Sequence, residues 1–142
     1  MKYIKKKITE LLNKTYTSDG REYGFIDMVL VIIEGTNRDM GTTYKILNDV
    51  IVPNISKYRI LVLINQADMA MKGRHWDYKL NKPDKVLLEF LDKQVSSIKE
   101  RVKEATGVQI LKPVYYSAEY GYNVEKVFDF IIENMPIDRR KI

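Results

Sequence analysis

The run Ile60-Leu61-Val62-Leu63-Ile64 constrains the fold more than any other part of the sequence. All five residues are apolar and three are β-branched, which is typical of a strand buried on both faces. The polar residues Asn65, Gln66 and Asp68 follow at once. Strands covered on both faces belong to open α/β sheets, whose ligands bind beyond the carboxyl ends of the strands. The sequence therefore predicts an α/β fold with a candidate site after Ile64.

Two more apolar segments, Phe25–Ile33 and Gln109–Tyr116, are predicted to be strands of the same sheet. Helical patterns over Gly41–Val52 and Pro83–Ala105 separate the three strands and are long enough for parallel crossovers. Because such crossovers are right-handed, both helices should lie on one face. We expect a three-stranded parallel sheet with the strands in chain order, 1-2-3.

The rest of the chain adds helices and loops around that sheet. Ile4–Tyr16 has helical spacing and is followed by turn residues through Gly20, and Pro53 is expected to end the second helix. Met69–Asn81 has no clear period and is predicted to be an excursion, whereas Asn123 is a predicted N-cap of the last helix. No linker divides the chain, so residues 1–142 should form a single domain with about four helices.

Composition excludes several classes of function. The sequence has no cysteine and one histidine, which excludes a disulfide framework, a thiolate metal site and a histidine cluster. No apolar run approaches the roughly 20 residues of a membrane span, and no apolar segment follows Lys5-Lys6-Lys7, so we expect a cytoplasmic protein. The net charge of +5 leaves RNA open as a partner, but the short basic runs favour a solvated face.

Two short motifs follow consecutive strands of the predicted sheet: Asn65-Gln66-Ala67-Asp68 and Ser117-Ala118-Glu119. They resemble the fourth and fifth guanine-recognition motifs of Era-like small GTPases, which usually read Asn-Lys-x-Asp and Ser-Ala-Lys. The segment from Gly121 to Val124 is similar to the turn that opens the last helix in these proteins. Residues 73–77, Gly-Arg-His-Trp-Asp, resemble a segment of predicted GTPases of the YfjP and YeeP type.

The resemblance implies a guanine-nucleotide site for GTP or GDP. Asp68 is then expected to accept both donors of guanine, the N1–H and the exocyclic amine, as a bidentate pair. By the same resemblance the main-chain N–H of Ala118 donates to the guanine O6, and Ser117 braces the loop that also carries Glu119. Asn65 would tie the base loop to the phosphate loop. Gln66 stands where these GTPases have a lysine that lies over the base.

Two other motifs of the family do not occur in the sequence. There is no Gly-x-x-x-x-Gly-Lys-Ser/Thr to hold the phosphates and magnesium, and no Asp-x-x-Gly to sense the γ-phosphate. Gly35–Thr43 imitates the first motif but has threonine in place of its lysine. Aligned on the two guanine motifs, the chain resembles the C-terminal half of a Ras-like P-loop GTPase domain. We expect a truncated G domain without catalytic residues, which binds magnesium only together with the missing half.

Three functions from different classes stay open at this point. The first is guanine-base recognition without hydrolysis by this chain alone. The second is a nucleotide-free interaction module, because Phe25–Ile33 has one strand partner and its free edge invites self-association or pairing with another chain. The third is RNA binding, which rests on net charge alone. His75 and Trp76 are interpreted as a local packing cluster rather than a lid.

Overall fold

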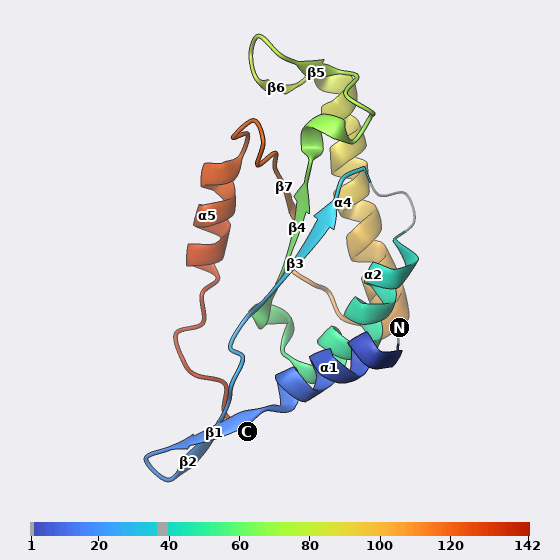
Figure 1. The fold of residues 1–142 in the computed structure, drawn as a ribbon. Coiled ribbons are helices and arrows are strands. Elements are labelled where there is room, and N and C mark those ends of the chain that lie inside the picture. The colour runs from blue at the N-terminus through green and yellow to red at the C-terminus, as the bar shows by residue number, and fades with distance from the viewer. Residues whose placement is uncertain (1, 37–39) are drawn as a thin grey trace.

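A parallel sheet of three strands lies at the centre of the computed structural model, which describes residues 2–36 and 40–142 (Figure 1). The strand order is β3 (Val29–Glu34), β4 (Ile60–Asn65) and β7 (Val114–Tyr115). Val29 to Glu34 pair in register with Ile60 to Asn65. The predicted α/β fold with a three-stranded parallel sheet is therefore present.

One face of the sheet packs against a layer of helices that forms the main core. Ile60, Val62 and Ile64 of β4 point into this layer and are buried. The layer contains α1 (Lys2–Asn13), the helical stretch from Gly41 to Asn54, and α4 (Lys85–Thr106). β4 is buried on both faces, since Leu61 and Leu63 on the opposite face are buried as well, and this explains its unbroken apolar sequence.

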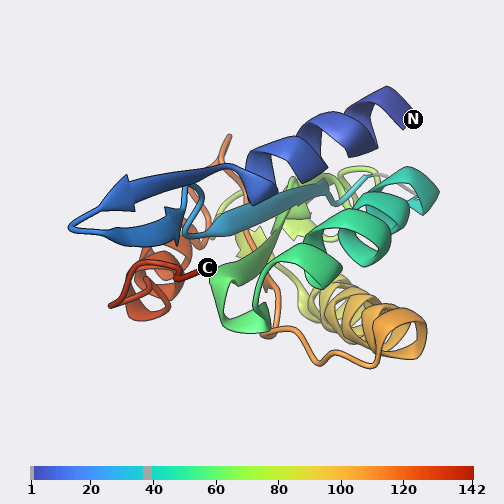
Figure 2. The ribbon, with the colours of Figure 1, turned by 90° about the horizontal axis from the view of Figure 1, so that it is seen from below.

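The opposite face is only partly covered. Here α5 (Val124–Glu133) lies on the side of the sheet away from α2 and α4 (Figures 1 and 2), and Leu61 and Leu63 of β4 are buried. Their register partners on β3, Leu30 and Ile32, are 41% and 58% exposed. This face of β3 is therefore more open to solvent than the same face of β4.

The N-terminal segment differs from the sequence prediction. The predicted helix Ile4–Tyr16 ends at Asn13, and β1 (Thr15–Ser18) pairs antiparallel with β2 (Arg21–Gly24). The two residues between the strands, Asp19 and Gly20, both have positive φ, at 50° and 75°. Asp-Gly in that conformation favours a tight hairpin. These residues therefore form the turn of a β-hairpin, whereas the sequence predicted only the end of a helix.

The prediction that Pro53 ends the second helix was also wrong by a short margin. The helix continues from α2 (Gly41–Ile46) through a π-helical turn, η1 (Leu47–Ile51), into α3 (Val52–Asn54). Pro53 has no N–H and its ring crowds the carbonyl four residues earlier. A π turn before the proline widens the helix and relieves that crowding. A short 3-10 turn, η2 (Lys57–Arg59), then leads into β4.

The excursion after β4 contains a second small hairpin, which was not predicted from the sequence. β5 (Trp76–Asp77) pairs with β6 (Lys82–Pro83), so Pro83 belongs to a strand and not to the first turn of a helix. α4 begins two residues later, where the Asp84 carboxylate accepts a hydrogen bond from the Leu87 N–H at 3.0 Å.

The third strand and the last helix also depart from their predicted limits. Only Val114 and Tyr115 of the predicted strand Gln109–Tyr116 pair with β4. Asn123 stands at the N-cap position of α5, but its side chain donates to the Tyr115 carbonyl at 3.0 Å and does not cap the helix. The described residues include no helix that is both long and apolar enough to cross a membrane.

Candidate functional site

All six residues predicted for the site line one cavity of about 500 Å³ at the carboxyl end of the sheet. They come from the segments that follow β4 and β7, and residues from the end of β3 complete the wall. The lining consists of Glu34, Thr36, Asn65, Gln66, Asp68, Met69, Ser117, Ala118 and Glu119.

Backbone hydrogen bonds hold these three segments together. The Gly35 N–H donates to the Asn65 carbonyl at 2.7 Å, and the Ala67 N–H donates to the Tyr116 carbonyl at 3.0 Å. A Cβ on Gly35 would lie 3.0 Å from the carbonyl oxygens of both Asn65 and Gln66. The close approach of the β3 and β4 ends therefore favours glycine at position 35.

Asn65 connects the two motifs directly. Its Oδ1 accepts hydrogen bonds from the Gln66 N–H at 2.8 Å and from the Ala118 N–H at 3.1 Å. The Ala118 N–H, which the resemblance assigns to the guanine O6, thus already has a partner within the chain. A ligand carbonyl must share this N–H with Asn65 or take it over.

Asp68 is the most unusual side chain of the cavity. It lies in the short helical turn η3 (Ala67–Met69) and is only 3% exposed, yet it lines the cavity. Within the described residues its carboxylate has no hydrogen bond and no ion pair. Its oxygen atoms are not sealed from solvent and are accessible from the cavity. A ligand with hydrogen-bond donors could therefore pair with Asp68.

Ser117 is fully buried and stabilises the loop after β7. Its Oγ accepts from the Tyr120 N–H at 3.3 Å, and its own N–H donates to the Tyr122 carbonyl at 3.0 Å. The Trp76 ring packs against both tyrosines, with centroid distances of 6.0 Å to Tyr120 and 5.2 Å to Tyr122. His75 instead binds Asp84 at 2.8 Å. Trp76 thus packs the excursion onto the loop that carries the second motif.

The cavity is acidic. Glu34, Asp68 and Glu119 line it, and no lysine or arginine is among its described lining residues. Partial burial raises the pKa of the nearby Tyr120 phenol, and the negative charges of Glu119 and Asp68 raise this pKa further. The electrostatic character of the cavity favours a neutral ligand group with hydrogen-bond donors over an anionic one.

Three of the lining residues were not predicted from the sequence: Glu34, Thr36 and Met69. Glu34 directly follows the apolar part of its strand, as Asn65 does. The expectation that polar residues at the carboxyl end of a buried strand line the site would therefore also have identified Glu34. The Thr36 Oγ1 donates to the Gln66 Oε1 at 3.0 Å, which positions the glutamine that replaces the expected lysine. Residues 37–39 of the P-loop imitation Gly35–Thr43 lie outside the described residues.

Comparisons with protein-family models, with curated proteins and with solved structures found no match. No group of three or more potential metal-ligating side chains is present within residues 2–36 and 40–142. The chemistry of this site must therefore be inferred from the residues that line the cavity.

Proposed function

We propose that the cavity recognises the guanine base of GTP or GDP. The observation that carries the proposal is the buried Asp68 carboxylate, which lines the cavity and has no partner among the described residues. Ala118 supplies a main-chain N–H in the same cavity, next to the Asn65 side chain. The site therefore offers two acceptor oxygens and one donor within one small space.

Guanine matches this pattern better than adenine does. Its Watson–Crick edge presents two neighbouring donors and one carbonyl acceptor, which suit a carboxylate and an N–H respectively. Adenine presents a ring-nitrogen acceptor where guanine has the N1–H. That acceptor would face the Asp68 carboxylate and repel it, whereas the guanine N1–H would donate to it.

The placement of the two motifs also supports a partial Ras-like P-loop GTPase fold. Both follow parallel neighbouring strands, β4 and β7, as the resemblance requires. The sequence contains neither phosphate-binding motif of that family. The proposed role is base recognition without GTP hydrolysis by this chain alone.

Calorimetric titration of GDP, ADP and XDP tests the proposal. Without a P-loop we expect GDP to bind no tighter than about 100 µM, on the order of 5.5 kcal/mol, and ADP to bind more weakly still. Asp68→Asn should shift the preference from GDP to XDP, because an amide can donate to the additional carbonyl of xanthine. Asp129→Asn removes the same charge from α5, outside the cavity lining, and should leave the preference unchanged.

Two results would contradict this assignment. A protein that binds GDP but is indifferent to Asp68→Asn would exclude Asp68 from the base site. ADP binding as tight as GDP binding would show that the cavity does not recognise the guanine base.

A second candidate function is self-association through β3. Leu30 and Ile32 are exposed beside the buried Leu61 and Leu63, and the β3 edge away from β4 pairs with no described strand. A second copy of the chain, related by two-fold symmetry, could pair with this edge and cover the apolar face. RNA binding and a cytoplasmic location stay predictions from sequence.

A further inference from the structure

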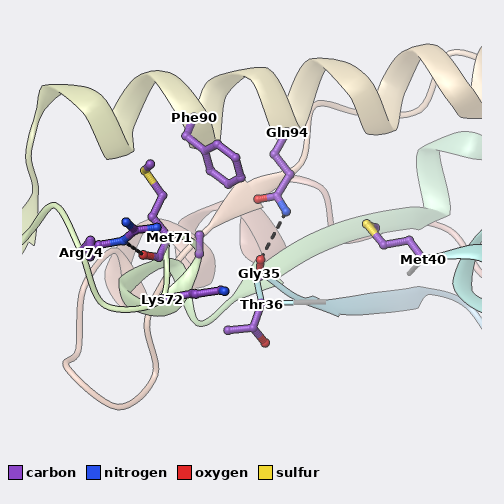
Figure 3. Close-up of a pocket in the computed structure, with 9 residues that line it drawn as sticks. Gly35, Thr36, Met40, Met71, Lys72, Arg74, Phe90 and Gln94 are labelled. Atoms are coloured by element: carbon purple, nitrogen blue, oxygen red, sulfur yellow. Dashed lines mark hydrogen bonds between the residues drawn. The ribbon is translucent and has the colours of Figure 1, made fainter. Parts of the chain in front are cut away.

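A second cavity, of about 390 Å³, adjoins the acidic one, and Thr36 lines both. It lies between α4 and the loops that follow β3 and β4 (Figure 3). In Figure 3, Phe90 and Gln94 extend from α4, which runs along the top. Arg74 lies at the left end of the cavity and Met40 at the right end. A ligand placed in the first cavity thus has a neighbouring space beyond Thr36.

The charges of the two cavities are opposite. Lys72 and Arg74 line the second cavity, which has no acidic residue in its described lining. The Lys72 side chain is directed toward Gly35 and Thr36 (Figure 3). Within the described residues neither cation has a carboxylate at ion-pair distance, and Arg74 uses its Nε in a long contact of 3.4 Å to the Met71 carbonyl. Both cations are therefore available to an anion.

Gln94 adds a poorly satisfied amide to the second cavity. Its Nε2 donates to the Gly35 carbonyl at 3.5 Å, which is long for an N–H···O bond. Its Oε1 is buried without a hydrogen-bond partner among the described residues. Turning the Gln94 amide toward an anionic oxygen would break only one weak hydrogen bond.

We propose that the second cavity binds the phosphate groups of the nucleotide whose base occupies the first cavity, with Lys72 and Arg74 as the phosphate-binding cations. This inference rests on the proposed guanine site. Glu34, Asp68 and Glu119 repel phosphates from the base cavity. In the second cavity, beyond Thr36, the phosphates would lie near the positive charges of Lys72 and Arg74. Lysine and arginine both bind phosphate oxygens well.

The test compares guanosine, GDP and inorganic pyrophosphate by calorimetry at low salt. We expect the wild-type chain to bind GDP about fivefold tighter than guanosine, the gain of a partly exposed charge contact. Lys72→Met should remove this difference without changing the affinity for guanosine. Lys79→Met removes the same charge from the same excursion, outside both cavity linings, and should preserve the difference.

The outcomes separate the two proposals. Equal affinities of the wild-type chain for guanosine and GDP would overturn the phosphate site and leave the base site standing. Pyrophosphate binding that depends on Lys72, without any guanosine binding, would support the anion site and overturn the base site. If none of the three ligands binds, both proposals fail.

Discussion

Gly35 allows the ends of β3 and β4 to approach more closely than a residue with a side chain would permit. Its N–H binds the Asn65 carbonyl, and a Cβ would press against the carbonyl oxygens of Asn65 and Gln66 at 3.0 Å. Both oxygens belong to backbone, which cannot move aside as a flexible side chain can. Gly35 is thus a positioning residue for the base cavity.

Gly35→Ala should therefore destabilise the fold and weaken GDP binding together. Overpacking of this kind costs about 1–3 kcal/mol, and separating the two loops would move Asn65 away from Ala118. Gly107→Ala is a suitable control, because Gly107 has φ 75° and a Cβ added there would meet no described heavy atom within 4 Å. That substitution costs about 1–2 kcal/mol through backbone strain alone.

Urea unfolding and calorimetric GDP titration of both variants separate these effects. The Gly107→Ala variant should lose stability but keep the wild-type affinity for GDP. If Gly35→Ala binds GDP as the wild type does, the close approach of the loops has no role in the site.

Which residues meet at the site followed from the sequence, but their hydrogen bonds did not. A polar residue after a buried strand lies at the carboxyl edge of a parallel sheet. The proximity of Asn65, Asp68 and Ser117 was therefore predictable from the sequence. The bond between the Asn65 side chain and the Ala118 N–H depends on the separation of two loops 53 residues apart in sequence. No local pattern encodes that distance.

The start of α4 depends on Asp84. The pKa of this carboxyl is lowered, first by the hydrogen bond from the Leu87 N–H and further by the His75 side chain at 2.8 Å. Because the pKa is lower in the folded state, Asp84 contributes stability above the ordinary aspartate pKa of about 3.9. This contribution is lost as pH falls through the lowered pKa.

We therefore expect the wild-type protein to lose thermal stability below about pH 4, with part of this loss assigned to Asp84. Asp84→Asn should flatten the pH dependence, since asparagine also caps helices but does not titrate in this range. Asp84→Ala should lower Tm at pH 7, because the Leu87 N–H loses its partner. Melting curves followed by circular dichroism between pH 3 and 7 measure both effects. Identical pH profiles for wild type and Asp84→Asn would contradict this role.

Long elements were predictable from sequence, and short ones were not. The apolar stripe of α4 and the apolar run of β4 repeat over enough residues to give a clear period. The pair β5 and β6 has two residues in each strand, too few for any period, and tertiary contacts of Trp76 hold it in place. The predicted third strand, Gln109–Tyr116, was too long. Apolar residues before Val114 pack into the core without pairing with β4.

At the scale of the whole molecule, the sheet is covered unevenly. The face toward α2 and α4 carries the core, whereas the face toward α5 is covered over β4 and open over β3 (Figure 1). The open area includes Leu30 and Ile32, next to a strand edge whose amides and carbonyls have no described strand partner. Apolar surface beside an unpaired edge is the arrangement that most favours association of sheets.

We expect the wild-type chain to dimerise with increasing concentration, with β3 of one copy antiparallel to β3 of the other and Leu30 and Ile32 buried at the interface. Ile32→Lys should weaken the dimer about tenfold or more, because two lysines would be buried at a two-fold interface. Ile137→Lys makes the same change at a residue that is 100% exposed and should leave the dimer unchanged. Sedimentation equilibrium over a wide range of concentrations measures each dissociation constant.

A wild-type chain that stays monomeric at the highest concentration would exclude self-association. A dimer that is insensitive to Ile32→Lys would place the interface elsewhere.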